Sequence, residues 1–389
     1  MINNSNFDNR SNLSKIIYFL VNNMTNQSSQ ITVGLGERSY LISVQSGLID
    51  RVGEQAKSMG LQSPVAIITD DTVAGLYGQR VKNSLEAAGY ESRIISFPAG
   101  ESSKHLQSIS HIYDEMVDLK PERKSGVIAL GGGVPGDMAG FVAATYLRGM
   151  RFIQVPTTLL AFVDSSVGGK TGIDHPGGKN LIGAFHQPSS VMIDPETLKT
   201  LDARQVKAGL AEIIKHGVIA DAELFDTVNN SLDKLKAVDL DEYCRIIPWN
   251  CRIKADVVEQ DEKESGIRAI LNFGHTFGHA IEMLTGFETY LHGEAVALGM
   301  LMEAQLGVRL GITPVETVDQ IRDILIKTGY SISKPEISTD QMMDSMFLDK
   351  KVEKGKLRFI IPTTIGNVVI HTIEDIDAVR QTWDEYNEA

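Results

Sequence analysis

Short runs of β-branched and aliphatic residues alternate with amphipathic segments between residues 31 and about 200. The apolar runs lie at residues 65–69, 93–97, 127–130 and 152–155. Between two of them, residues 106–117 place apolar side chains at every third or fourth position, which is typical of a helix packed on a sheet. The alternation predicts an α/β domain with a parallel β-sheet covered by helices over 31–200.

From about residue 202 the strand pattern gives way to long helical periodicities. They continue to about residue 330 and are interrupted at Gly266, Gly286, Gly311 and Gly329. A short β-like tail follows at 357–361 and 368–370, and we expect it to pair with strands formed elsewhere. Residues 201–389 are therefore predicted to form a second, mainly α-helical domain.

The first 30 residues are rich in Asn and Ser. Their apolar run at 16–21 is shorter than a typical signal-peptide core or a membrane span, so we predict a disordered extension at 1–30. The whole chain has 389 residues, 42% of them hydrophobic, which is enough to build the cores of two domains. Only two cysteines occur, Cys244 and Cys251, which excludes a disulfide framework and favours a reducing cytoplasm.

The formal net charge of −13 disfavours nucleic acid and anionic membranes as partners. An anionic substrate must therefore meet locally clustered cations. Candidates stand in or beside glycine-rich, polar or metal-associated segments: Arg148, Arg151, Lys170, Lys179, Lys215, Lys254 and Arg268. Two polar loops, expected at 164–170 and 177–180, can carry such groups. Lysine binds phosphate as a point charge and arginine binds carboxylate in a fork, so a substrate with both groups would explain the mixture. Solvated surface charge is the alternative for any single member.

A glycine-rich segment at 131–137, GGGVPGD, follows a predicted strand and opens a predicted helix. Its backbone N–H groups can face a pyrophosphate, although the next strand ends without the acidic ribose ligand and a tight turn without a ligand fits equally well. Asp70, residues 100–104 and Thr157–Thr158 end neighbouring strands at the same sheet edge. We predict a dinucleotide across this edge. The alternative is that Asp70 and Thr158 merely cap helices.

His275 and His279 lie four residues apart in a predicted helix, and His292 follows. Glu212 lies in a mainly apolar helix, where an ionised carboxylate needs a partner. Two imidazoles and this carboxylate would leave open positions on a divalent metal ion. Spacing alone selects His275 and His279 as the pair, and the alternative is that one or two of these histidines are core residues. Two other histidines are interpreted as structural: His216 and His371.

Six motifs resemble, in order, those of the 3-dehydroquinate synthase family. They are GGGVPGD at 131–137, VPTTLL at 155–160, DSSVGGK at 164–170, GKNLIG at 178–183, AEIIK at 211–215 and NFGHTFGH at 272–279. The resemblance runs from about residue 31 to 375. It implies an N-terminal NAD-binding α/β domain, a C-terminal helical metal-binding domain, a homodimer, tightly bound NAD, and Zn²⁺ with Co²⁺ as a substitute.

The resemblance also implies roles for particular residues. It makes Glu212, His275 and His292 the metal ligands and His279 a catalytic group beside the substrate, against the pair that spacing selects. The other implied catalytic residues are Arg148, which would reach across the dimer interface, Asp164, Lys170, Lys179, Asn180, Lys215, Lys254, Arg268 and Asn272. The implied NAD contacts are Asp70, Gly100, Glu101, Lys104, Gly132, Gly133, Val134, Gly136, Asp137, Thr157, Thr158, Lys170, Lys179, Thr197, Leu198 and Thr200. One of Lys350 and Lys351, which otherwise look like an exposed charge run, would bind phosphate. Thr72 stands where the family has an asparagine.

The implied activity is that of a carbon–oxygen lyase of the shikimate pathway, which makes precursors of the aromatic amino acids. Such an enzyme converts 3-deoxy-D-arabino-heptulosonate 7-phosphate to 3-dehydroquinate and phosphate through transient oxidation by NAD, phosphate elimination, re-reduction, ring opening and aldol closure. Three alternatives stay open: a metal-dependent NAD polyol or alcohol dehydrogenase, another sugar phosphate cyclase, and a non-enzymatic NAD-sensing or scaffold protein. A neutral polyol needs no cation set, and the aminocyclitol-forming cyclases act on substrates without a carboxylate.

Overall fold

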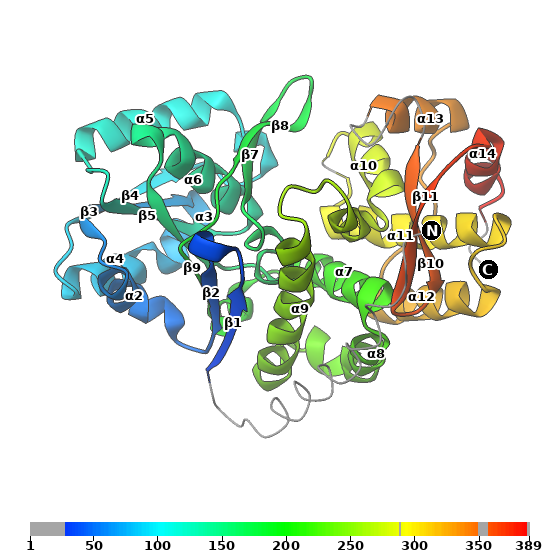
Figure 1. The fold of residues 1–389 in the computed structure, drawn as a ribbon, viewed down its shortest axis with the longest axis horizontal. Coiled ribbons are helices and arrows are strands. Elements are labelled where there is room, and N and C mark those ends of the chain that lie inside the picture. Colours follow the sequence, from blue (N-terminus) through cyan, green and yellow to red (C-terminus); the bar gives the residue numbers. More distant parts are fainter. Residues whose placement is uncertain (1–27, 288, 349–356, 387–389) are drawn as a thin grey trace.

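The computed structural model describes residues 28–287, 289–348 and 357–386. They form an α/β half and a mainly helical half that lie side by side, left and right in Figure 1. The predicted fold class, an α/β part with a parallel sheet followed by a helical part, is confirmed. Most of the predicted extension and both Lys350 and Lys351 fall outside the described residues.

The α/β half is built on a seven-stranded sheet in the order β1-β2-β9-β6-β5-β3-β4. Its strands are β1 (Ser29–Val33), β2 (Tyr40–Val44), β3 (Gln62–Asp70), β4 (Ser92–Phe97), β5 (Ser125–Gly131), β6 (Arg151–Pro156) and β9 (Ser190–Ile193). Every pair of neighbours is parallel except β1 and β2. The four strands predicted from apolar runs are confirmed. β1 begins two residues before the start that the sequence pattern suggested.

Helices cover both faces of this sheet, which explains why its strands are apolar at consecutive positions. Val65 and Ile67 of β3 pack with one cluster beneath α2 (Val52–Ser58) and α4 (Gln79–Ala87). Ala66 and Ile68 point to the opposite face, beneath α5 (Leu106–Leu119) and α6 (Gly133–Thr145). Successive residues of a strand face opposite sides, so one strand serves both clusters. The short helices α3 (Asp71–Val73), η3 (Leu48–Arg51), η4 (Ala74–Gly78), η7 (Ala161–Ser165) and η8 (Pro195–Thr200) fill the connections.

A two-stranded hairpin, β7 (Lys170–His175) and β8 (Gly178–Phe185), stands outside the main sheet. Polar loops were expected at 164–170 and 177–180, and of these residues 166–169 and 177 do lie outside helices and strands. Residues 161–165 form η7, and most of the following segment forms the antiparallel hairpin. Glycines obscure the side-chain alternation by which strands are recognised in a sequence. They are needed here because the strands approach closely: a side chain at Gly172 would lie 2.6 Å from the carbonyl oxygen of Ile182 across the ladder.

The helical half contains α7 (Ala203–Ala220), α8 (Ala222–Lys236), α9 (Leu240–Gln260), η9 (Ile267–Asn272), α10 (His275–Leu284), α11 (His292–Arg309), α12 (Val315–Thr328), α13 (Thr339–Leu348) and α14 (Ile376–Asp384). Asp202, Asp221 and Asp239 accept backbone hydrogen bonds at the starts of α7, α8 and α9, as N-cap residues do. The tail strands β10 (Arg358–Thr364) and β11 (Asn367–Thr372) pair with each other. Their expected pairing with strands formed elsewhere is wrong.

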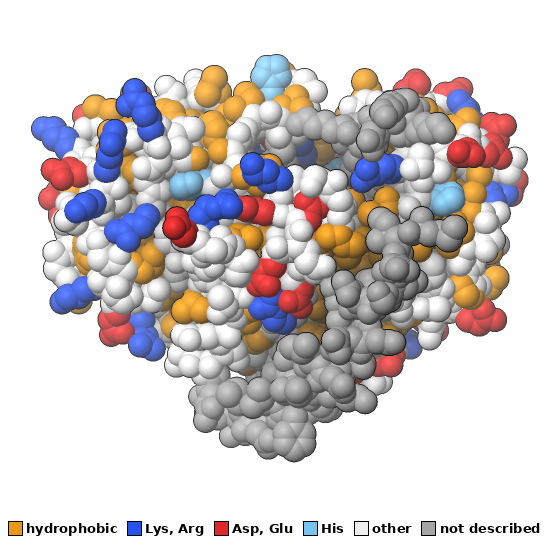
Figure 2. Space-filling model, in the orientation of Figure 1, with side chains coloured by type: hydrophobic (Ala, Val, Ile, Leu, Met, Phe, Trp, Pro, Cys, Tyr) orange, Lys and Arg blue, Asp and Glu red, His pale blue; other side chains and the backbone are white. Residues whose placement is uncertain are grey.

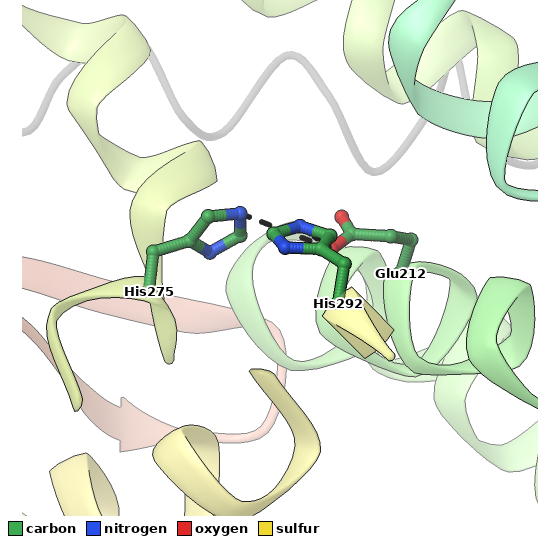
Figure 3. A group of neighbouring side chains, drawn as sticks. All are labelled: Glu212, His275 and His292. Carbon is green, nitrogen blue, oxygen red and sulfur yellow. Dashed lines mark ion pairs between the residues drawn. The ribbon is translucent and has the colours of Figure 1, made fainter. Parts of the chain in front are cut away.

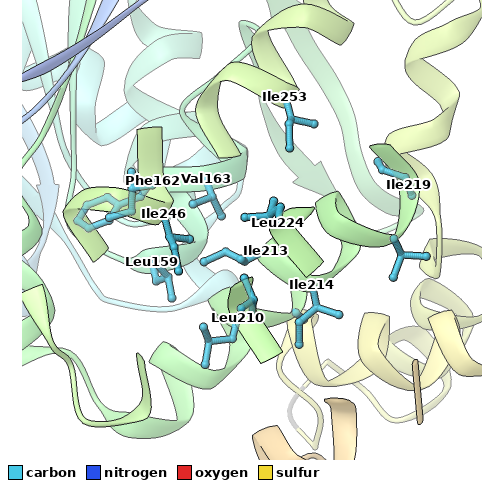
Figure 4. Packing of buried hydrophobic residues seen from close by; sticks show 14 of the residues in the cluster. Leu159, Phe162, Val163, Leu210, Ile213, Ile214, Ile219, Leu224, Ile246 and Ile253 are labelled. Atoms are coloured by element: carbon cyan, nitrogen blue, oxygen red, sulfur yellow. The ribbon is translucent and has the colours of Figure 1, made fainter. Parts of the chain in front are cut away.

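The largest buried cluster joins the two halves. Ile42 and Val44 of β2 and Phe162 of η7 belong to the same cluster as Ile213 of α7 and Ile246 of α9, and Figure 4 shows several of its aliphatic side chains meeting around α7. The sheet and helical halves therefore share one core, and the polar residues between them are held on a common scaffold. Within the described part of the chain, no helix combines the length and the apolar composition needed to cross a membrane.

Candidate active site

A cleft of about 1040 Å³ runs between the two halves. Hairpin β7–β8 and η7 line one side, and α9, η9, α10 and the start of α11 line the other. The predicted catalytic residues on its walls are Asp164, Lys170, Lys179, Asn180, Lys215, Lys254, Arg268, Asn272 and His279. On the face drawn in Figure 2, basic side chains are most numerous over the α/β half, whereas acidic side chains are spread over the left, the middle and the right edge. The cleft itself carries both charges, since Lys170, Lys179, Lys215, Lys254, Arg268 and Arg358 line it together with Asp137, Asp164, Glu264 and Glu282.

Three side chains converge at the inner end of the cleft: Glu212 from α7, His275 from the start of α10 and His292 from the start of α11 (Figure 3). Nε2 of His275 lies 3.9 Å and Nε2 of His292 3.8 Å from Oε1 of Glu212. Zinc stands about 2.0–2.2 Å from nitrogen and oxygen ligands, so these three atoms can share one ion. Among the described residues, none donates a hydrogen bond to Oε1 of this fully buried carboxylate, which is what a metal ligand needs.

Hydrogen bonds at the other ring nitrogens aim both imidazoles. Nδ1 of His275 lies 3.1 Å from the carbonyl oxygen of Phe273, and Nδ1 of His292 lies 3.1 Å from Oε2 of Glu282. With the protons on Nδ1, the Nε2 lone pairs face Glu212, as in many metal centres where a histidine donates its second N–H. Burial alone would raise the pKa of Glu282, but the hydrogen bond from His292 and the charge of Lys179 lower it.

His279 lies beside this group rather than in it. Its ring centroid is 5.2 Å from that of His275 and 5.9 Å from that of His292, and it groups with Glu282 and His292 instead of Glu212. Spacing in the sequence selected His275 and His279 as a pair, whereas the fold brings His275 and His292 to Glu212. His279 follows His275 by one turn of helix and therefore lies on the same side of α10.

Buried ion pairs connect the metal-ligand candidates to the cations. Lys215, three residues after Glu212, forms an ion pair with its Oε2, and both side chains are almost inaccessible. Lys254 donates to the carbonyl oxygen of Asp164 at 2.5 Å and pairs with its carboxylate. Burial would raise the pKa of Asp164, but the charges of Lys254 and Lys215 hold it well below its usual range. Asp164 is therefore a fixed anion that orients Lys254.

Arg268 is buried behind this network, and its guanidinium donates to the carbonyl oxygens of Glu262 at 2.5 Å and Gly168 at 3.2 Å. These partners are neutral, so its positive charge stays available to the cleft. Burial lowers the pKa of Lys254, and Arg268 and Lys215 add to that effect although Asp164 opposes it. Three cations thus lie close together in the cleft, beside the carboxylates of Asp164, Glu212 and Glu264, and such a grouping can attract an anionic substrate.

The glycine-rich segment lies at the point where the strand order reverses. β3 has β4 on one side and β5 on the other, so the connections from β3 and β5 leave in opposite directions and open a crevice between their ends. Gly131 has a φ of 144°, and a side chain there would lie 2.6 Å from the ring of Pro135. Gly132 begins α6 without a side-chain cap, which leaves the first N–H groups of the helix available for a phosphate.

Several predicted nucleotide contacts have structural partners at this edge. Asp70 accepts a hydrogen bond from Val73 N at 2.9 Å and Thr158 accepts one from Ala161 N at 3.2 Å, so both cap helices as the alternative interpretation held. Lys104 donates at 2.6 Å to both Asp137 and Asn180. Burial opposes its charge, but Asp137 and Glu101 raise the pKa of Lys104. Other members of the predicted set stand at the same edge or on η8: Gly100, Gly133, Val134, Gly136, Thr157, Thr197, Leu198 and Thr200.

Two cations of the predicted cluster lie away from the cleft. Arg151 donates to the carbonyl oxygens of Met59 and Gly60 at 2.6 and 3.0 Å and does not line the cleft, so the alternative of an ordinary surface charge holds for it. Arg148 is exposed in η6 (Tyr146–Arg148), where it and Leu147 have positive φ, and it does not line the cleft. A role for Arg148 in this chain's own cleft is therefore not supported by its position.

Sequence reasoning missed three cleft residues. Glu264 pairs with Lys170 and accepts a hydrogen bond from Asn272 at 2.7 Å. Glu282 contacts His292 and Lys179, and the ring of Phe287 lies 4.1 Å from Nζ of Lys179. Glu282 follows the second histidine of its motif by three residues, which places it one helical turn farther along α10. That spacing was the available signal.

Two family models match consecutive parts of the chain. The model for the 3-dehydroquinate synthase N-terminal region matches residues 94–208, and the model for the C-terminal region matches residues 209–352. The chain belongs to the 3-dehydroquinate synthase family. A curated member of the family, 3-dehydroquinate synthase from Nostoc punctiforme, is 47% identical over 357 residues, which cover 91% of this chain and 98% of the relative.

Solved structures place the family fold among sugar phosphate cyclases. The structure of 2-epi-5-epi-valiolone synthase from Streptomyces hygroscopicus subsp. jinggangensis, with NAD⁺ and Zn²⁺ bound, superposes with a TM-score of 0.83 at 28% identity and covers 90% of this chain and 98% of its own. A 2-deoxy-scyllo-inosose synthase, complexed with carbaglucose-6-phosphate, NAD⁺ and Co²⁺, superposes with a TM-score of 0.84 at 24% identity and covers 92% and 100%. At that identity the second likeness concerns the fold.

Proposed function

We propose that this protein converts 3-deoxy-D-arabino-heptulosonate 7-phosphate to 3-dehydroquinate and inorganic phosphate, as a cytoplasmic homodimer that uses NAD and a divalent metal ion, Zn²⁺ or Co²⁺. One observation carries the proposal: a cluster of two imidazoles and one carboxylate opens into the same cleft as Lys170, Lys179, Lys215, Lys254 and Arg268. The family to which the chain belongs supports it.

The residues present fit both cofactors. Glu212, His275 and His292 would hold the ion, because their facing atoms are close and Oε1 of Glu212 lacks a hydrogen bond among the described residues. The uncapped start of α6 at Gly132 and Gly133 would hold the pyrophosphate. When bound, the ion would supply polarisation of substrate hydroxyls and NAD would supply a transient hydride acceptor.

The residues of the cleft would have distinct roles in binding the substrate and stabilising its charges. Lys215 and Lys254 would stabilise negative charge on oxygen atoms of the substrate, since both are buried and directed by carboxylates. Arg268 and the hairpin residues Lys179 and Asn180 would hold one anionic end of the substrate. Lys170, Asn272 and His279 would hold the phosphate and offset the charge that grows as it leaves. Anchors at both ends favour the conformer that closes to a ring.

The cations argue against the other candidate functions. A polyol or alcohol dehydrogenase acts on a neutral substrate, and the cleft cations Lys170, Lys179 and Arg268 would then have no substrate anion to bind. A scaffold protein has no use for the grouping of Glu212, His275 and His292. A cyclase whose substrate lacks a carboxylate would leave Arg268 without an anion to bind. We therefore keep the carboxylate-bearing sugar phosphate as the substrate.

The homodimer rests on Arg148. This cation projects from an exposed turn in which two consecutive non-glycine residues have positive φ, a conformation that costs about 1–3 kcal/mol per residue and would be explained by a contact with a partner subunit's cleft. We further propose that residues 31–200 bind NAD and that residues 201–389 supply the metal centre. Sedimentation is expected to give twice the 42.6 kDa of one chain.

The test follows inorganic phosphate released from the heptulosonate phosphate, with NAD and Zn²⁺ present, while absorbance reports NADH. Phosphate release without net NADH is expected, and it should disappear with a chelator and in the Lys170→Ala variant. NADH accumulation with a simple polyol and no phosphate release would instead make this protein a dehydrogenase. Sugar phosphates that lack the carboxylate are tested in the same assay, because phosphate release from one of them would indicate another sugar phosphate cyclase reaction.

A further inference from the structure

Glu282 is a buried carboxylate that contacts both sides of the cleft. It lies on α10 with 3% of its surface exposed. Its Oε2 is 3.1 Å from Nδ1 of His292 and its Oε1 is 3.4 Å from Nζ of Lys179. His292 belongs to the helical half, whereas Lys179 belongs to hairpin β7–β8 of the α/β half. One side chain therefore connects a candidate metal ligand to a candidate substrate-binding lysine.

The lysine end of this connection has three partners. Lys179 lies 3.6 Å from a carboxylate oxygen of Glu101 in the α/β half. Across the cleft it meets Glu282 and the face of Phe287, with Nζ 4.1 Å from the ring centroid. A cation over an aromatic face and beside a buried carboxylate is attracted by both. Glu282 and Phe287 of the helical half therefore hold the ammonium group of Lys179 in a defined position in the cleft.

The histidine end fixes a tautomer. A carboxylate at Nδ1 keeps the proton on that nitrogen, so the lone pair of Nε2 is directed at Oε1 of Glu212, 3.8 Å away. Such a carboxylate behind a ligand histidine orients the ring and raises its basicity. His275 is oriented by a neutral backbone carbonyl instead, so the two histidines differ in how strongly they are held.

We propose that Glu282 is a positioning residue that couples the metal centre to the hairpin. Its Oε2 orients His292, and its Oε1 holds Lys179 in position. The inference rests on the proposed metal centre and goes beyond it, because it makes ion affinity and the position of a substrate-binding lysine depend on one carboxylate. Loss of Glu282 should therefore disturb two measurable properties that lie on opposite sides of the cleft.

The first experiment titrates Co²⁺ into the full chain stripped of metal and follows the visible absorption bands. Glu282→Gln preserves the shape of the side chain and removes its charge. We expect its Co²⁺ affinity to fall about 10–100-fold, as for other groups behind a ligand histidine. The Lys179→Met control should change that affinity by less than about fivefold, because Lys179 contacts Oε1 of Glu282 and not the oxygen that orients His292. Co²⁺ binding by Glu282→Gln as tight as that of the parent would overturn the proposal.

A second arm distinguishes positioning from direct ligation, because Glu282 also groups with His279 and His292. If Glu282 acts behind His292, Glu212→Gln should abolish Co²⁺ binding while His279→Gln leaves the absorption bands in place. If Glu282 were itself a ligand, His279→Gln would weaken Co²⁺ as strongly as Glu212→Gln, and the proposal would be wrong. Circular dichroism and the thermal midpoint check folding, and Glu282→Asp, which shortens the side chain, replaces Glu282→Gln if that variant does not fold.

A third arm concerns the substrate. KM should rise in Glu282→Gln and in Lys179→Met. The rise in KM of the double variant should be smaller than the product of the two single rises, because both substitutions remove the same contact. A rise in the KM of the double variant equal to the product of the two single rises would overturn the proposed coupling. The Co²⁺ titration needs no substrate, so a parent that binds Co²⁺ without releasing phosphate contradicts the proposed function alone. A parent that binds no Co²⁺ contradicts the metal centre and this inference together.

Discussion

Glu212 and Lys215 are three residues apart on α7, with exposed side-chain fractions of 0% and 1%. Such a pair is costly to break from one side, since the remaining charge is buried without a partner. We expect Lys215→Met to lower the free energy of unfolding by about 3–5 kcal/mol, measured by denaturant in the presence of a chelator. Lys199→Met, which removes an exposed ion pair with Glu196, should change it by less than about 1 kcal/mol.

His216 provides a residue-scale prediction for pH. It is fully buried, and its Nδ1 lies 3.0 Å from Oδ1 of Asn250. Burial, reinforced by Lys215, lowers its pKa from 6.5 to about 3. Between these values the unfolded chain binds a proton that the folded chain does not, so stability falls as pH drops below 6.5.

This contribution has a slope of up to about 1.4 kcal/mol per pH unit. Denaturant midpoints measured from pH 4 to 7 should fall less steeply in His216→Gln than in the parent. Identical slopes in His216→Gln and the parent would contradict the prediction.

At the scale of elements, the metal centre depends on how closely α11 approaches α7. A side chain at Gly293, next to His292, would lie 1.9 Å from the carbonyl oxygen of Ala208 on α7. Gly293→Ala must therefore push α11 away from the helix that carries Glu212. We expect a loss of about 1–3 kcal/mol in stability, typical of overpacking, together with weaker Co²⁺ binding. Gly75→Ala is the matched control, because nothing lies within 4 Å of the added methyl group.

The same elements show what the sequence could predict. Strands β3, β5 and β6 were foreseen because both of their faces are buried, so apolar residues are continuous. Hairpin β7–β8 was missed because glycines replace the side chains that would mark strands. The residues of the cleft were found through motifs, whereas Glu282 and Phe287 act through contacts between helix and hairpin that no local pattern records.

The whole molecule is expected to unfold as one unit. Residues of β2, η7, α7 and α9 share a single buried cluster, so neither half can lose its structure without exposing apolar surface of the other. Calorimetry of the full chain should show one transition, and two resolved transitions would contradict this expectation. Adding a chelator should lower its midpoint, since an ion that binds only the folded chain stabilises it by mass action.

The two oxygens of Glu212 face different partners: Oε1 faces the histidines and Oε2 faces Lys215. An ion at Oε1 withdraws charge from the carboxylate and loosens its hold on the lysine, which is then freer to attract an anion in the cleft. Linkage is reciprocal, so an anion at Lys215 must tighten ion binding by the same factor. Co²⁺ should therefore bind more tightly in the presence of inorganic phosphate, and this single side chain would make metal loading a condition for tight substrate binding.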